Sequence, residues 1–197
     1  MDLIEVKMNA IEATLFHIPM ASISLALTLD DLNIYKVNNI TSVSPVVLMT
    51  SVFFIAFVYF IVDSYLMFKN YVPRHNIYFF HHGLALVSLP VSYFLKWNYA
   101  RYVMYYMTFE LSTPIYNFTY ELHKRGYTAD NWIFWFNQWL FAIVFTCVRV
   151  LFGTYTSIIL VRDILNDQSI SNYYTIFPIM LQSLMYYWFY FIVNKLV

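Results

Sequence analysis

Long apolar runs alternate with short polar segments along this chain of 197 residues. A helix needs about 20 mostly apolar residues to cross the hydrocarbon of a bilayer, so these runs predict membrane-spanning helices. Ser44 and Pro45 mark the start of the second run, because serine is a good N-cap and proline suits the first helical position. The expected fold is all-α, a polytopic membrane helix bundle with about six transmembrane helices, at residues 13–29, 46–66, 76–95, 101–121, 131–153 and 173–194.

The segments around these runs indicate how the helices connect. His17 and Pro19 interrupt the first run, which leaves a re-entrant segment as the alternative to a spanning helix. The link at residues 96–100 is short enough to predict an antiparallel hairpin of the third and fourth helices. A loop after the fifth helix is predicted by three charged residues, Arg162, Asp163 and Asp167.

Composition supports the same class of protein. Hydrophobic residues make up 61% of the chain, charged residues only 11%, and the mean hydropathy is +0.58, which together indicate an integral membrane protein. The 11 basic and 11 acidic side chains cancel, so a nucleic-acid partner is not expected. The single Cys147 rules out an internal disulfide. With no repeat and no long linker, we expect one domain over residues 1–197.

Several polar side chains fall inside the predicted helices, where each costs at least about 2.5 kcal/mol if it is charged and unpartnered. Glu110 shares one stripe of a continuous α-helix with Pro114, Asn117 and Glu121, because their offsets are 4, 7 and 11. We interpret the polar residues as the lining of a lipid-binding or polar cleft, formed by Asp63, His81, His82, Glu110, Thr113, Asn117 and Arg149.

The direction of successive helices favours a common location for these groups. Helices that alternate in direction place residues 66–75 and 121–130 on one side of the membrane. His81 and His82 then lie about 9 Å inside that side at about 1.5 Å per residue, and Asn117 lies about one turn inside it. The predicted cleft therefore opens to that side.

Other interpretations of the same residues stay open. Polar side chains can instead join helices through hydrogen bonds worth about 0.6 kcal/mol each, with no chemistry. Asp63 can reach the lipid headgroups, and Arg149 either pairs with a carboxylate or extends from a helix end to the surface. His81 and His82 point about 100° apart on a helix and lack the i, i+4 spacing of a zinc motif, so neither a metal nor a cofactor is expected.

Four short motifs resemble the TLC-domain family in order and spacing. They are Asp63 followed by the lysine of MFK, then YFFHHGLAL, then FELSTPIYN, then FTCVR. The family groups translocon-associated membrane proteins, ceramide synthases and smaller TLC-domain proteins of unknown or lipid-regulatory role. The resemblance covers roughly residues 9–194, is strongest to the smaller proteins, and implies that residues 13–29 form a true membrane span.

The chain also departs from the ceramide synthases of that family. Those enzymes join a sphingoid amine to an acyl-CoA, and after their paired histidines they carry a His-Asp and a second Asp three residues on. This chain keeps His81 and His82 but has Phe109-Glu110 at the His-Asp position and Thr113 near the second Asp. The resemblance therefore implies a lipid-related membrane protein more firmly than it implies acyl transfer.

Two functions are compatible with these residues. The favoured one is a protein that binds lipid or a membrane partner and influences membrane lipid composition or trafficking. The alternative is a ceramide-synthase-like N-acyltransferase with acyl-CoA as its second substrate, in which His81 or His82 deprotonates the amine and Glu110 orients that base. In either case we expect a multi-pass protein of the endoplasmic reticulum or a related internal membrane.

Overall fold

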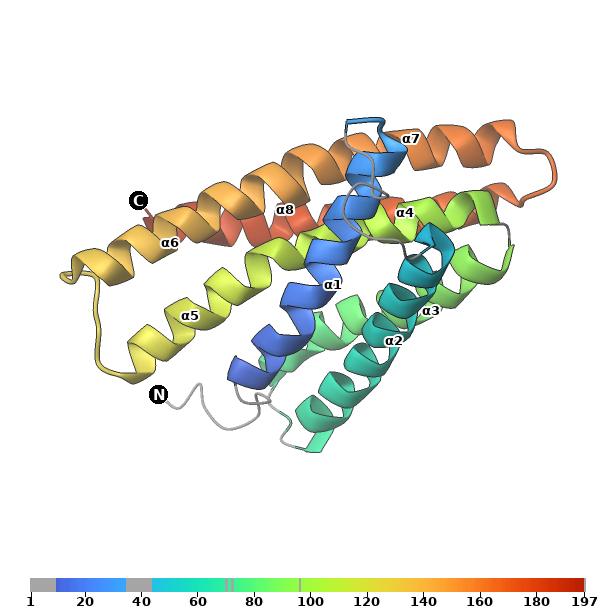
Figure 1. Ribbon diagram of the computed structural model, residues 1–197. Coiled ribbons are helices and arrows are strands. Elements are labelled where there is room, and N and C mark those ends of the chain that lie inside the picture. Colours follow the sequence, from blue (N-terminus) through green and yellow to red (C-terminus); the bar gives the residue numbers. More distant parts are fainter. Residues whose placement is uncertain (1–9, 35–43, 70, 72, 96, 197) are drawn as a thin grey trace. The chain divides into compact units, whose positions relative to one another are not determined.

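The computed structural model describes residues 10–34, 44–69, 71, 73–95 and 97–196, and regular structure in these residues is entirely helical (Figure 1). The all-α prediction is therefore confirmed. The chain divides into two compact units, here called the N-terminal unit (Met1–Thr108) and the C-terminal unit (Phe109–Val197). The prediction of one domain over residues 1–197 stays a prediction.

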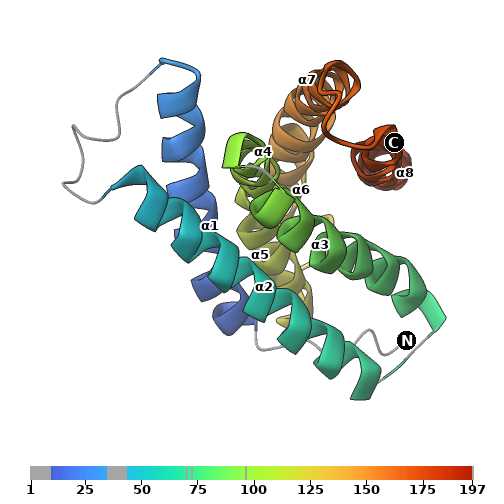
Figure 2. The same ribbon diagram turned by 90° about the vertical axis from the view of Figure 1, so that its right-hand side faces the viewer.

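Four α-helices build the N-terminal unit (Figure 2). The first helix packs against the second and fourth, and the third helix also packs against both, so the four surround one core. Tyr105 donates a hydrogen bond to the carboxylate of Asp31, which ties the end of the first helix to the fourth. The elements are α1 (Ala10–Asp31), α2 (Pro45–Lys69), the short 3-10 helix η2 (Pro73–His75), α3 (Asn76–Leu95) and α4 (Trp97–Met107).

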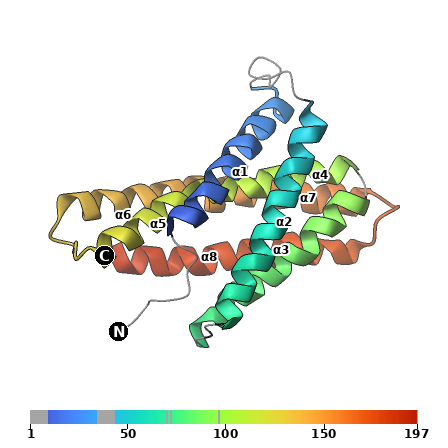
Figure 3. The same ribbon diagram turned by 60° about the horizontal axis from the view of Figure 1, so that its bottom comes forward.

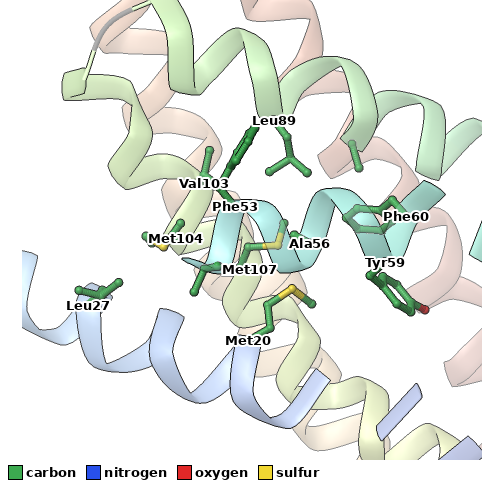
Figure 4. Close-up of a cluster of buried hydrophobic side chains, with 12 residues drawn as sticks. Met20, Leu27, Phe53, Ala56, Tyr59, Phe60, Leu89, Val103, Met104 and Met107 are labelled. Carbon is green, nitrogen blue, oxygen red and sulfur yellow. The ribbon is translucent and has the colours of Figure 1, made fainter. Parts of the chain in front are cut away.

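The core of the N-terminal unit is apolar at its centre and contains polar groups along α1. Met20, Ala56 and Met107 come from three different helices and converge there (Figure 4). His17, only 1% exposed, places its ring edge-on against Tyr59, with 4.5 Å between ring centroids. These contacts explain why α1 persists through Pro19, because the buried side of α1 is packed above and below the proline.

The C-terminal unit contains one long helical segment and its neighbours. α8 lies alongside α6 and α7, and α5 packs against α6 (Figure 3). Asn131 caps the start of α6 by accepting a hydrogen bond from the Ile133 amide, and Gly126 supplies the positive φ of 85° that ends the turn after α5. The elements are the 3-10 helix η3 (Thr108–Ser112, which begins one residue before this unit), α5 (Thr113–Lys124), α6 (Trp132–Phe145), the π-helix η4 (Thr146–Leu151), α7 (Phe152–Asn166), the 3-10 helix η5 (Asn172–Thr175) and α8 (Ile176–Leu196).

Three helical segments are long and apolar enough to cross a membrane among the residues that the structure describes. They are Pro45–Lys69, Trp132–Asn166 and Asn172–Lys195. They correspond to the predicted spans at 46–66, 131–153 and 173–194. The predicted spans at 13–29, 76–95 and 101–121 coincide with helical structure, but their crossing of the membrane stays a prediction.

Three details of the predicted helices are wrong. The helix predicted at 101–121 is not continuous, because η3 interrupts it at Thr108–Ser112. Of the predicted loop residues only Asp167 lies beyond the end of α7. Arg162 and Asp163 lie within α7, where Leu160 and Ile164 keep the spacing of one buried stripe while Arg162 is exposed. The link at 96–100 is shorter than predicted, because α4 already begins at Trp97; residue 96 lies outside the described residues.

Gly153 marks a close approach within the C-terminal unit and provides a test of its packing. A Cβ at this position would lie 2.7 Å from Oε1 of Gln182 and 2.7 Å from Cζ of Phe109. Both side chains are buried, so neither can move without disturbing its neighbours. We expect Gly153→Ala to lower the free energy of unfolding by about 1–3 kcal/mol, measured by thermal unfolding in detergent.

Gly83→Ala is the matched control, because a Cβ at Gly83 meets no atom within 4 Å. Alanine also favours a helix over glycine by up to about 1 kcal/mol, so this variant should be as stable as the native protein or more stable. Equal melting temperatures for the two variants would contradict the close packing at Gly153.

Candidate functional site

His82 lies at the centre of a polar cluster in the N-terminal unit. Its Nδ1 is 3.1 Å from Oγ of Ser64, and its Nε2 is 3.5 Å from Oδ2 of Asp63. Asp63 and Ser64 are consecutive on α2 and reach the same imidazole on α3 from its two sides. The His82 side chain is 7% exposed and that of Asp63 is 17% exposed, so the pair is largely withdrawn from the surface.

Aromatic packing fixes the orientation of this imidazole. Phe60, one turn before Ser64 on α2, meets the rings of both His81 and His82 edge-on, at centroid distances of 5.9 and 5.1 Å. The Asp63 carboxylate favours the tautomer of His82 that carries its proton on Nε2, and in that tautomer Nδ1 accepts the hydrogen bond from the Ser64 hydroxyl. The cluster, called here the Ser64–His82–Asp63 cluster, can therefore bind a polar headgroup or transfer a proton.

A second polar cluster surrounds Arg149 in the C-terminal unit. Its Nη2 donates to Oγ1 of Thr113 at 3.0 Å and lies 4.0 Å from Oε1 of Glu110. Thr113 in turn donates to Oε2 of Glu110 at 2.7 Å and so bridges the guanidinium and the carboxylate. Nε of Arg149 donates to the Phe109 carbonyl and to the Ser112 hydroxyl, at 3.1 and 2.9 Å.

Apart from Thr113, the first residue of α5, the groups of this Arg149 cluster come from two irregular helical segments. Phe109, Glu110 and Ser112 belong to η3, whose 3-10 winding changes the direction in which these groups point. Arg149 belongs to η4, and a π-helix widens the backbone and frees carbonyl groups there. One of them, the carbonyl of Arg149 itself, accepts a hydrogen bond of 3.1 Å from Nε2 of Gln182 on α8. The two distorted segments, η3 and η4, are thus also the segments that hydrogen-bond to each other.

The positions of the predicted cleft residues divide between the two units. Asp63 and His82 meet in the N-terminal unit, with His81 beside them. The C-terminal unit brings together Glu110, Thr113 and Arg149. One cleft formed by all seven residues therefore stays a prediction.

Two further expectations about these residues are decided by the geometry. The predicted stripe is wrong only in extending one α-helix to Glu110, which lies in η3; Pro114, Asn117 and Glu121 do share α5. The open question about Arg149 is answered in favour of pairing: the residue is 8% exposed and points to Glu110 rather than to the surface.

Some buried polar residues were not found by sequence reasoning. Ser64 and Gln182 looked unremarkable because an uncharged polar residue in an apolar helix carries no signal until its partner is placed. Asn137 on α6 donates hydrogen bonds to the Ile115 carbonyl and to the Thr119 hydroxyl, at 3.0 and 2.6 Å. Asn117, by contrast, was among the predicted cleft residues; it is 5% exposed, and its amide nitrogen has no hydrogen-bond partner among the described residues.

Metal binding finds no support in the described part of the chain, where His, Cys, Asp and Glu side chains form no group of three that could hold an ion. The side chains of the two clusters offer hydrogen bonding, ion pairing and proton transfer.

The described residues form helices, three of them apolar enough to cross a bilayer, and enclose charged groups between helices, which is typical of membrane proteins. The TLC domain model matches residues 9–194, so the chain belongs to the TLC domain family. The expected family resemblance is confirmed. The family and the apolar helices together indicate a membrane protein.

Two curated relatives carry the same domain. A TLC domain-containing protein of Acanthamoeba polyphaga mimivirus is 37% identical over 120 residues, which are 61% of this chain and 59% of that protein. An uncharacterized TLC domain-containing protein of Schizosaccharomyces pombe is 27% identical over 93 residues, 45% of this chain and 32% of that protein. The chain thus spans about three fifths of the length of the first relative and about one third of the length of the second. No solved structure gives a significant match.

The Arg149 cluster allows a test of its internal pairing. Arg149→Met leaves the buried Glu110 carboxylate without its cation, which is expected to cost about 3–5 kcal/mol of unfolding free energy. Adding Glu110→Gln should recover part of this loss, because the uncompensated charge is removed. Thermal unfolding of the native, single and double variants in detergent measures the coupling. Additive losses would show that the two side chains do not interact.

Proposed function

We propose that this TLC-domain protein binds a membrane lipid at the Ser64–His82–Asp63 cluster and thereby influences membrane lipid composition or trafficking. The observation that carries the proposal is the imidazole of His82 held between a hydroxyl and a carboxylate, within two largely apolar helices. Such groups are costly in an apolar medium unless they serve a polar ligand or each other.

The surroundings of the cluster suit a molecule with a polar head and apolar chains. Val62 and Tyr65, which flank Asp63 and Ser64 on α2, are 42% and 63% exposed. Lys69, the last residue of α2, is five residues beyond Ser64, about 7.5 Å along the helix axis. A lipid headgroup region near Lys69 would place the cluster at the depth where headgroup and acyl chains join.

Acyl transfer to a sphingoid amine is the second function, and one observation favours it. His82 faces a carboxylate, which is the arrangement that orients a neutral imidazole as a general base. Glu110, expected to orient the base in such an enzyme, has Thr113 and Arg149 as partners within its own unit. This difference makes lipid binding the preferred function.

Lipid binding predicts a specific co-purifying lipid. The native protein, purified in mild detergent, is expected to retain one lipid class above its level in the host membrane, identified by mass spectrometry. Asp63→Asn and His82→Ala should reduce this retention about 10- to 100-fold, because hydrogen bonds to charged groups contribute about 1.5–3 kcal/mol.

Ser51→Ala is the matched control on α2, because the Ser51 hydroxyl bonds to the Val47 carbonyl of its own helix and not to the cluster. All variants should accumulate in membranes at the native level. Retention of bulk phospholipid alone by the native protein, in host proportions, would contradict the proposal.

The second function predicts ceramide synthesis from a sphingoid base and acyl-CoA. We expect purified protein to form no ceramide, because the residues near the acidic positions of the synthases are Glu110, paired with Arg149, and Thr113. Ceramide is measured by mass spectrometry after incubation in detergent or vesicles. Turnover that is lost in His82→Ala would instead establish the acyltransferase.

A further inference from the structure

The Ser64 hydroxyl has a different partner from several other hydroxyl groups in these helices. Hydroxyl groups inside apolar helices usually bond to the carbonyl one turn earlier. Thr50, Ser51, Thr146 and Ser183 all do so, at 2.7–2.9 Å. Ser64 has its hydrogen bond with Nδ1 of His82 on another helix. This contact joins a hydroxyl group to a base rather than to a backbone acceptor.

We propose that Ser64 is a nucleophile activated by His82 and Asp63, which accepts the acyl group of a lipid ester or acyl thioester. The inference rests on the lipid binding proposed above and extends it from binding to chemistry. Its parts are those of an activated serine: a hydroxyl within hydrogen-bonding distance of an imidazole, and a carboxylate on the other ring nitrogen. Asp63 acts as the positioning residue, because it sets the tautomer of His82 and stabilises the imidazolium once formed.

The covalent step involves only Ser64, His82 and the acyl donor. Oγ of Ser64 attacks the carbonyl carbon of the acyl donor while Nδ1 of His82 takes the hydroxyl proton. The bond from that carbon to the alcohol oxygen of a lysolipid, or to the sulfur of a thiol, then breaks. The leaving oxygen or sulfur takes the proton from Nδ1, so the products are an acyl ester on Ser64 and a free alcohol or thiol. Water or a second alcohol resolves the ester by the reverse route.

The place of Ser64 in the fold suits an acyl donor that is dissolved in a membrane. Ser64 is half-buried, and exposed apolar side chains precede and follow it on α2, including Ile61 and Phe68 at 46% and 74% exposure. An acyl chain can therefore lie along α2 while its carbonyl group approaches Oγ. Direct deprotonation of a sphingoid amine by His82 does not use Ser64 at all, which separates this inference from the acyltransferase considered above.

The experiment uses the full chain in lipid nanodiscs and a long-chain alkyl fluorophosphonate, which labels activated serines. We expect labelling of the native protein at Ser64, located by peptide mass spectrometry, and loss of that label in Ser64→Ala. His82→Gln should slow labelling by at least about 100-fold, and Asp63→Asn should slow it while Asp63→Glu restores part of the rate. Ser51→Ala should label at the native rate.

Two acyl donors then identify the substrate class. Nanodiscs of phosphatidylcholine supply an ester, and added oleoyl-CoA supplies a thioester; an oleoyl or lipid-derived acyl group on the Ser64 peptide, with release of lysolipid or thiol, supports the inference. Labelling that is equally fast in His82→Gln, or a native protein that retains its lipid but gives no label at Ser64, overturns the inference and leaves lipid binding intact. A native protein that neither retains a specific lipid nor labels at Ser64 overturns both.

Discussion

A charged or hydrogen-bonding group among apolar helices must find a partner, and this constraint accounts for both polar clusters of the protein. In the N-terminal unit, His82 is held between Ser64 and Asp63. In the C-terminal unit, Arg149 and Glu110 are joined directly and through Thr113. Each cluster joins segments far apart in sequence, so the same contacts that lower the cost of burial also select how the helices pack.

The two clusters provide partners for their polar groups in different ways. The Arg149 cluster is largely satisfied from within: its cation, carboxylate and hydroxyls bond to one another, and the distorted backbone of η4 receives its donor from Gln182. Such an arrangement favours a structural role. The Ser64–His82–Asp63 cluster is smaller and lies beside exposed side chains of α2. A partly accessible cluster is the better place for a ligand or a reaction.

The hydrophobic pattern alone was enough to predict the all-α fold class, because a long apolar run that crosses a membrane has few alternatives to a helix. It located Asp63, His82 and Arg149 as unusual residues, since each carries a polar group inside such a run. It missed the windings of η3 and η4, because their sequences TFELS and TCVRVL contain no proline or glycine that would indicate a break. It also missed Ser64, whose importance depends on which ring lies opposite it in the folded chain.

The continuous segment from Trp132 to Asn166 has a consequence for how the protein meets its bilayer. Its 35 residues measure about 52 Å at about 1.5 Å per residue, whereas the hydrocarbon layer is about 30 Å thick. An upright segment would extend about 20 Å beyond the hydrocarbon, through the headgroups and into water. A tilted segment would have a shorter part of its length outside the hydrocarbon. Bilayer thickness therefore acts on the tilt of this segment, and with it on the membrane depth of Arg149, which lies near its midpoint.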